Sequence, residues 1–227
     1  MKFLYLIMIM IFMFGCSEQT DVSKKALDKD EYDILYTIGV EVSQQVKVLG
    51  LNAAELQAVQ SGFSDNILEN QLQVDTSQHR QKLQEWGSKR IEAAAMRYSK
   101  QGEEYVKKFL EDPSIKKTVS GALIKDISAG TGKQPTGSSR VKIHYHGTLV
   151  DGTVFDSSKD RKEPGEFALG GLIKCWGEGI PQMKVGGTAR LVCPPETAYG
   201  ENGSPPVIPP NSTLIFDVEL LEILDES

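Results

Sequence analysis

The chain lacks the sequence features that mark several classes of enzyme and metalloprotein. It contains no CxxC pair and no Gly-rich phosphate loop, and its 3 histidines and 3 cysteines form no apparent Ser–His–Asp or Cys–His arrangement. His144 and His146 fall on the same face of an expected strand, but no third ligand is visible, and His79 stands alone. We therefore expect neither a metal ion nor another cofactor.

Positive charge is not concentrated anywhere in the chain. The net charge is −6, from 25 basic and 31 acidic residues, and both halves share the acidic excess. A protein that binds nucleic acid usually presents a basic patch or stripe to the phosphates. We therefore expect no nucleic-acid partner.

The one long apolar run lies at the N-terminus. Lys2 is followed by apolar residues 3–14 and then by Gly15 and Cys16. This order is typical of a secretory signal, and the run is too short to span a bilayer comfortably. Gly15-Cys16 resembles a bacterial lipobox, which predicts that residues 1–16 are a lipoprotein signal peptide and that Cys16 is lipidated. The alternatives are a plain signal peptide and an uncleaved anchor.

Lipidation would place the protein in the cell envelope, where more than one acyl chain gives stable anchoring. Ser17 stands where Asp would favour the inner membrane, so we expect an outer-membrane anchor that faces the periplasm or the surface. Export also predicts an oxidising compartment for the two remaining cysteines.

No proline occurs before Pro113, and the preceding residues have a helical pattern. Apolar residues recur at spacings of three and four up to Leu49, and Gly50 is a typical stop signal. Asn52 and Glu55 then form a capping-box-like pair for a second helix.

A third helix is expected from a cap at Asp75 to about residue 110, where Pro113 ends it. Its middle is polar, which is typical of a solvated strut. The two shorter helices carry apolar stripes with little to cover them in one chain. We therefore interpret residues 17–120 as a dimerisation or chaperone arm of a homodimer. The alternative is a small bundle with the base of the third helix.

The hydrophobic period changes after the arm. Apolar and polar residues alternate in three segments, which predicts half-buried strands at residues 141–146, 188–192 and 213–221. Turn signals that contain Gly or are rich in Pro separate these segments. Only one short helix is expected, near residues 177–183. The predicted fold of residues 121–224 is α+β: a mainly antiparallel β-sheet wrapped around a short helix, preceded by the all-α arm.

Six short motifs follow one another through this region. They are Tyr145-His146-Gly147, the octapeptide 151–158, Leu172-Ile173-Lys174-Cys175-Trp176, Ala198-Tyr199-Gly200, Ile208-Pro209-Pro210-Asn211 and the heptapeptide 214–220. Each is weak alone, but in this order they resemble the FKBP-type peptidyl-prolyl cis–trans isomerases. The arm and the lipid signal further resemble the exported, macrophage-infectivity-potentiator type of that family.

The resemblance implies a non-covalent isomerase whose hydrophobic pocket accelerates rotation about X–Pro bonds. It implies that Asp156 orients the tyrosines, that the Tyr199 hydroxyl and the Ile173 amide donate to substrate carbonyls, and that Trp176 forms the floor. The implied catalytic residues are Asp156, Tyr199, Phe155 and Tyr145, and the implied substrate-binding residues are Leu172, Ile173, Trp176, Ile208 and Phe216.

Two departures from the family pattern bear on this pocket. Gly165 stands where many members carry an aromatic wall residue, and the segment 167–172 is short, so we expect one side of the site to be open. Macrolide inhibitors are candidate ligands by the resemblance. The resemblance also brings Cys175 and Cys193 close together, which leaves a disulfide and two buried free thiols as alternatives.

The expected partners are proline-containing unfolded or nascent exported proteins, whose folding the enzyme would accelerate. The rival hypothesis is a holdase-type chaperone or surface binding module in which isomerisation is incidental.

Overall fold

The computed structural model describes residues 27–224. The predicted signal peptide and Cys16 lie outside the described residues. The residues up to Gly39 and those from Val40 onwards form two separate compact units. Among the described helices, none has the length and apolar character needed to cross a membrane.

The arm begins with two helices that local signals delimit, α1 (Lys29–Lys47) and α2 (Ala53–Ile67). Gly50 has φ +60°, a left-handed conformation that suits glycine after a helix end. The Asn52 side chain accepts hydrogen bonds from the backbone of Ala54 and Glu55, both at 3.0 Å, and the Glu55 carboxylate accepts from the Asn52 amide at 2.9 Å. The capping box expected at this position is therefore present.

The apolar stripes of these two helices remain uncovered. No residue of α1 or α2 is buried. On α2, Phe63 is 54% exposed and Ile67 is 63% exposed, which is high for large apolar side chains. Arg90 of the third helix donates to the Leu49 and Gly50 carbonyls and pairs with Glu55, so the contacts to α2 here are polar. The described chain leaves these apolar faces available to another surface.

The third helix begins slightly later than the sequence predicted. Asp75 caps a 3₁₀ turn, η1 (Thr76–His79), through the Ser77 amide at 3.0 Å, and α3 (Arg80–Phe109) follows directly. Asp112 then accepts from the Ser114 amide at 2.9 Å and organises the turn around Pro113.

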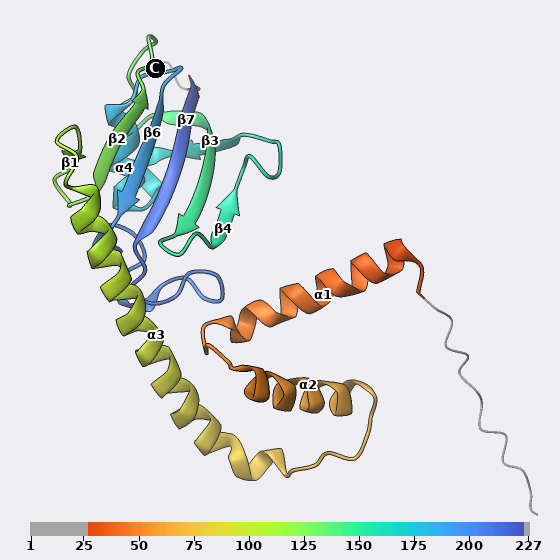
Figure 1. The fold of residues 1–227 in the computed structure, drawn as a ribbon. Helices are drawn as coiled ribbons and strands as arrows, with labels where there is room; N and C mark the ends of the chain where they lie inside the picture. Colours follow the sequence, from red (N-terminus) through yellow and green to blue (C-terminus); the bar gives the residue numbers. More distant parts are fainter. Residues whose placement is uncertain (1–26, 225–227) are drawn as a thin grey trace, which may run out of the picture. The chain divides into compact units, whose positions relative to one another are not determined.

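The C-terminal region is an antiparallel sheet, which confirms the predicted fold class (Figure 1). Its strand order is β1-β2-β6-β7-β3-β4, and β5 also pairs with β3. The strands are β1 (Lys116–Lys117), β2 (Leu123–Ser128), β3 (Arg140–Leu149), β4 (Val154–Ser157), β5 (Gly165–Ala168), β6 (Thr188–Cys193) and β7 (Leu214–Ile223). The long β3 and β7 pair along most of their length and form the centre of the sheet.

One face of the sheet packs on a short helix, α4 (Lys174–Gly179), and on the 3₁₀ turn η3 (Ile180–Gln182). The helix begins three residues before the predicted start, because the Ile173 carbonyl accepts from the amides of Trp176 and Gly177, both at 3.0 Å. Three further 3₁₀ turns, η2 (Leu169–Gly171), η4 (Pro195–Thr197) and η5 (Gly200–Asn202), lie in the connections.

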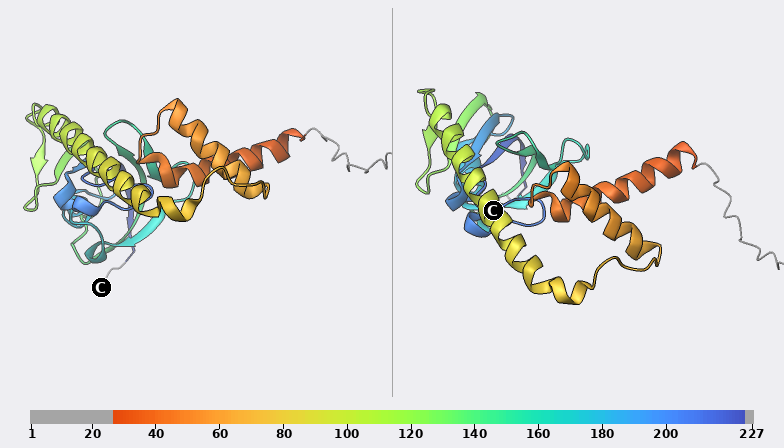
Figure 2. Two further views of the ribbon diagram at one scale, coloured as in Figure 1. Left: turned by 90° about the horizontal axis from the view of Figure 1, so that it is seen from below. Right: turned by 60° about the horizontal axis from the view of Figure 1, so that its bottom comes forward.

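The other face of the sheet packs on the last turns of α3 (Figures 1 and 2). Leu123, Val192 and Ile215 of β2, β6 and β7 form a second apolar cluster. The side chains packed against it are Tyr105, Val106, Phe109, Ile115 and Val150. The packing therefore continues across the boundary that the sequence placed at residue 120, and the end of α3 belongs structurally to the C-terminal domain.

Gly102 allows α3 to approach this domain closely. It is buried, and a Cβ atom at this position would lie 2.3 Å from Oγ1 and 2.9 Å from Cβ of Thr213. Thr213 is itself only 2% exposed, so it has little room to move.

We expect Gly102→Ala to destabilise the protein by about 1–3 kcal/mol, because overpacking at the Thr213 contact outweighs the better helix propensity of alanine. Gly87→Ala on the same helix is the matched control. A Cβ at Gly87 meets nothing within 4 Å, so that substitution should stabilise by up to about 1 kcal/mol. Urea denaturation measures both changes, and stabilisation by Gly102→Ala would show that α3 does not pack on the domain at this point.

Candidate active site

A pocket of about 340 Å³ opens between α4, the start of β7 and the loop that follows β6. Its volume lies within the usual range of small-molecule sites. All nine residues implied by the family resemblance line it, together with Phe167, Ser204, Pro205 and Val207. The lining is Tyr145, Phe155, Asp156, Phe167, Leu172, Ile173, Trp176, Tyr199, Ser204, Pro205, Val207, Ile208 and Phe216.

Trp176 forms the centre of an aromatic cluster at the base of this pocket. Its ring lies edge-to-face with those of Tyr145, Phe167 and Phe216, at centroid distances of 5.2, 5.3 and 5.0 Å. Phe155 meets Phe216 in the same manner at 5.4 Å. Edge-to-face contacts of this kind fix ring orientations more strictly than aliphatic packing does. The pocket therefore has a rigid apolar base.

Gly147 gives the wall of the pocket its shape. It lies in β3, two residues after Tyr145, and a Cβ there would be 2.8 Å from the Phe155 ring and 3.0 Å from the Phe216 ring. Only glycine leaves room for both rings, which explains the glycine in the Tyr145-His146-Gly147 motif.

Three polar groups close a hydrogen-bonded triangle at one side of the pocket. The Tyr145 hydroxyl donates to Oδ2 of Asp156 at 2.6 Å, and Arg161 donates to Oδ1 of Asp156 at 2.5 Å. Arg161 also donates to the Tyr145 oxygen at 2.8 Å. Each member therefore restricts the other two, and the Asp156 carboxylate is matched by a guanidinium.

Burial and hydrogen bonding oppose each other at Asp156. Burial tends to raise the pKa of its carboxyl, but the bonds from Tyr145 and Arg161 outweigh burial and hold this pKa below the ordinary value of 3.8. Burial, aided by the hydrogen bond to Asp156, raises the pKa of the Tyr145 hydroxyl above 10.0. At neutral pH the aspartate is therefore ionised and the tyrosine is protonated.

The rim of the pocket comes from the loop between β6 and β7. Tyr199 is 43% exposed there and immediately precedes η5, whereas Ile208 is nearly buried. Gly200 and Gly203 have φ +61° and +64°, and the Asn211 amide donates to the Gly200 carbonyl at 3.0 Å. These constraints hold Tyr199 at the mouth with an accessible ring.

Cys175 and Cys193 are joined by a disulfide, with a Cα–Cα distance of 5.5 Å. Both residues are completely buried. The bond links the first turn of α4, next to Trp176, to the end of β6. Of the two alternatives that the sequence left open, the described structure contains the disulfide.

Sequence reasoning missed five residues of the site, which are Ser204, Pro205 and Val207 of the rim loop, Phe167 and Arg161. Phe167 was not assigned to it, yet its ring would lie 2.3 Å from a Cβ at Gly165. The ring therefore fills the space beside Gly165 and supplies a wall on the side that was expected to be open. Arg161 was also missed, and its spacing of five residues from Asp156 was the available signal.

The two strand histidines take part in local hydrogen bonds. Nδ1 of His144 lies 3.1 Å from the Ser158 hydroxyl, and Nδ1 of His146 lies 2.9 Å from the Ser157 hydroxyl. Within residues 27–224, no group of three or more His, Cys, Asp or Glu residues is arranged to hold a metal ion.

This arrangement suits a reaction that twists a bond without breaking one. Rotation about a peptide C–N bond crosses a barrier of about 18–20 kcal/mol, because amide resonance is lost on the way. The twisted amide has less charge separation than the planar one, so apolar surroundings favour it. The aromatic base offers an apolar surface to a proline ring, and Tyr199 and Ile173 line the pocket beside it.

The lowered pKa of Asp156 predicts a pH-dependent contribution to stability. A carboxyl whose pKa is lower in the folded state stabilises the fold above its unfolded pKa, and this stabilisation is lost as the pH falls through the folded pKa. We therefore expect the stability gap between the native protein and Asp156→Asn to be constant from pH 7 to about pH 5 and to shrink below the ordinary carboxyl pKa of 3.8.

Urea denaturation at several pH values measures this gap. Tyr145→Phe removes one of the donors to Asp156. The stability gap between Tyr145→Phe and the Tyr145→Phe, Asp156→Asn double variant should therefore shrink less below pH 3.8 than the gap in the native protein does. A gap that stays the same at acidic pH would contradict the ionised triangle.

Comparison with known proteins identifies the family of the chain. Residues 131–221 match the model of the FKBP-type peptidyl-prolyl cis–trans isomerases, and residues 31–124 match the domain amino-terminal to such isomerases. The second match covers most of the described arm.

Similar whole proteins and a similar structure are also known. The FKBP-type isomerase FkpA of Escherichia coli K12 is 34% identical over 88% of this chain and 78% of its own length. The FKBP-type 22 kDa isomerase of the same strain is 37% identical over 87% of this chain and 97% of its own. The crystal structure of FkpA from Escherichia coli has a TM-score of 0.62 at 33% identity and covers 86% of this chain and 97% of that one. Both family models match, and relatives that are at least 34% identical are covered over at least 78% of their own length. The chain therefore belongs to the FKBP-type peptidyl-prolyl cis–trans isomerases.

Proposed function

We propose that this isomerase accelerates the folding of exported, proline-containing polypeptides, that a lipid on Cys16 holds it at the cell envelope, and that its N-terminal helices pair two copies. The observation that supports catalysis most directly is the aromatic base around Trp176 beside the triangle of Tyr145, Asp156 and Arg161. Uncatalysed X–Pro isomerisation takes tens of seconds or longer, which is slow enough to limit folding.

Pairing through the arm is supported by the uncovered apolar faces of α1 and α2. A monomeric protein rarely keeps a large contiguous apolar patch exposed to water. The exposed large side chains on these two helices are Tyr32, Ile34, Leu35, Tyr36, Ile38, Val40, Val42, Leu56, Val59, Phe63 and Ile67. A second copy of the chain would cover such a face, and two linked pockets would bind one unfolded client with higher avidity.

The rival function is a holdase, for which isomerisation is incidental. A holdase needs exposed apolar surface but has no need of an oriented carboxylate at the edge of a proline-sized pocket. The hydrogen-bonded triangle therefore favours the isomerase as the primary function. The same apolar pocket is also a candidate site for macrolide inhibitors.

Asp156→Ala should lower kcat/KM for a short X–Pro peptide by about tenfold or more. The substitution removes the acceptor that orients Tyr145 and Arg161, and one such bond is worth about 1–2 kcal/mol. Coupled peptide hydrolysis measures turnover, and refolding of a proline-limited protein should slow in parallel. A folded Asp156→Ala variant that turns over as fast as the unsubstituted protein would contradict the proposed site. Turnover near the uncatalysed rate in the unsubstituted protein would favour the holdase.

Two variants separate anchoring from pairing. Cys16→Ser should release the protein from membrane fractions without changing its mass in solution, because it removes only the lipid attachment site. Val59→Ser with Phe63→Ser should convert a dimer into monomers without releasing it from membranes, because it removes apolar area from α2. Fractionation and analytical ultracentrifugation measure the two outcomes. Retention of the Cys16→Ser protein would contradict the lipid anchor, and a native protein that sediments as a monomer would contradict the dimer.

A further inference from the structure

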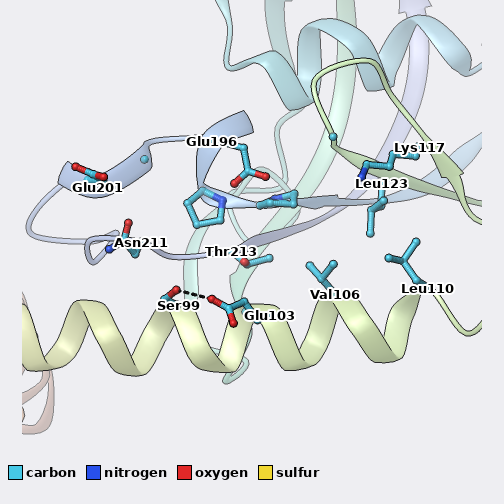
Figure 3. A pocket seen from close by; sticks show the side chains of 15 residues that line it. Ser99, Glu103, Val106, Leu110, Lys117, Leu123, Glu196, Glu201, Asn211 and Thr213 are labelled. Atoms are coloured by element: carbon cyan, nitrogen blue, oxygen red, sulfur yellow. Dashed lines mark hydrogen bonds between the residues drawn. The ribbon is translucent and has the colours of Figure 1, made fainter.

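A second cavity, of about 450 Å³, lies between α3 and the catalytic domain (Figure 3). We call it the α3 groove. One wall is α3, and the other is formed by residues around Pro194 and by the loop that continues to Thr213. Its lining is Ser99, Gly102, Glu103, Val106, Leu110, Lys117, Gly121, Leu123, Pro194, Pro195, Glu196, Gly200, Glu201, Asn211 and Thr213.

The base and one end of the α3 groove are apolar. Val106 and Leu110 project from α3 and Leu123 comes from β2 (Figure 3), and Pro194 and Pro195 also line the cavity. Gly102 and Thr213 both line the cavity, so their close contact does not fill it.

Negative charge dominates the polar part of the α3 groove. Glu103 stands on the helix wall, and Glu196 and Glu201 stand on the domain wall, while Lys117 is the single basic side chain in the lining. Glu103 accepts a hydrogen bond from the Ser99 hydroxyl at 3.0 Å (Figure 3). None of the three carboxylates has an ion-pair partner within 4.0 Å in the described chain. The groove therefore presents a net negative charge beside apolar surface.

The α3 groove and the catalytic pocket share one loop. Tyr199 and Ser204 line the catalytic pocket, whereas Gly200 and Glu201, between them in sequence, line the groove. Residues 199 and 201 are two positions apart, so their Cα atoms are within about 7.6 Å of each other. An extended polypeptide advances by about 3.3–3.6 Å per residue. The Glu201 end of the groove therefore lies within a few residues of extended chain from Tyr199 at the rim of the pocket.

We propose that the α3 groove is a secondary binding site for the client polypeptide, which accepts an extended segment with a basic side chain next to an apolar one. The lysine or arginine would lie among Glu103, Glu196 and Glu201, and the apolar neighbour would pack on Val106, Leu110 and the proline rings. The enzyme would then prefer X–Pro bonds that have a basic residue roughly two to six positions away. This inference rests on the isomerase function and adds a substrate preference to it.

The test compares peptides of three kinds with the full chain. One is a short X–Pro tetrapeptide that cannot reach the groove, and two are longer peptides, about 12 residues in length, that carry either lysine–leucine or glutamate–leucine steps on both sides of the proline. We expect kcat/KM for the basic peptide to exceed that for the acidic one by about three- to tenfold at low salt, and the preference to disappear at about 1 M salt. Equal values for the two long peptides would overturn the proposal.

Matched variants assign the preference to the α3 groove. Glu103→Gln, Glu196→Gln and Glu201→Gln together should abolish it. The control combines Glu104→Gln, Glu111→Gln and Glu222→Gln, which change the net charge equally at exposed positions outside the groove lining. A preference that survives the groove variant, or that the control variant also loses, would overturn the proposal.

The tetrapeptide distinguishes a failure of the groove hypothesis from a failure of the isomerase function. Its turnover should be unchanged in both triple variants, which also shows that they are folded. Absence of tetrapeptide turnover in the native protein would instead contradict the isomerase function itself.

Discussion

The burial of Trp176 at the start of α4 is the contact on which the catalytic domain depends. The indole packs edge-to-face on three rings that come from β3, β5 and β7, so one side chain connects the helix to widely separated strands. The neighbouring Cys175 adds a covalent link to β6. Because the helix is only six residues long, it cannot be stable alone, and these contacts hold it against the sheet. The floor of the pocket is therefore also the centre of the hydrophobic core.

This dual role explains how a rigid site can act on a substrate that changes its own conformation. A catalyst that favours a twisted amide over a planar one must keep its own shape while the substrate changes. Gly147 leaves space for two rings to close the wall, and the triangle of Tyr145, Asp156 and Arg161 holds the polar side. The carboxylate lies at an apolar pocket without destabilising it, because a guanidinium and a hydroxyl together satisfy its charge. The rim loop with Tyr199 is the more exposed part, which suits the entry and departure of a chain.

Much of the fold and most of the pocket could be predicted from the sequence because they depend on local signals. Gly50 and the Asn52–Glu55 capping box marked the ends of helices, and alternating residues marked the strands. The nine pocket residues, in contrast, were implied by the resemblance of the ordered motifs to a known family. Phe167 was missed because its role depends on the tertiary contact of its ring with Gly165 and Trp176, which no local spacing reveals. The packing of α3 on the outer face of the sheet was missed for the same reason, since Tyr105 and Phe109 have an ordinary helical spacing.

Because α3 packs on the sheet, it connects the arm to the catalytic domain more firmly than a solvated strut would. Its N-terminal half carries polar and apolar residues exposed to solvent, whereas its C-terminal half is fixed by Gly102 and by the apolar cluster over β2, β6 and β7. A bend between the arm and the catalytic domain would therefore have to lie N-terminal to this fixed half. The segment from Pro194 to Thr213 lies between α3 on one side and the catalytic pocket on the other. A polypeptide that contacts both sides of this segment would be held close to Tyr199 by groups that take no part in rotating the X–Pro bond. Binding energy from remote parts of a substrate then serves to position the reacting bond, which is where an enzyme without covalent chemistry can use it.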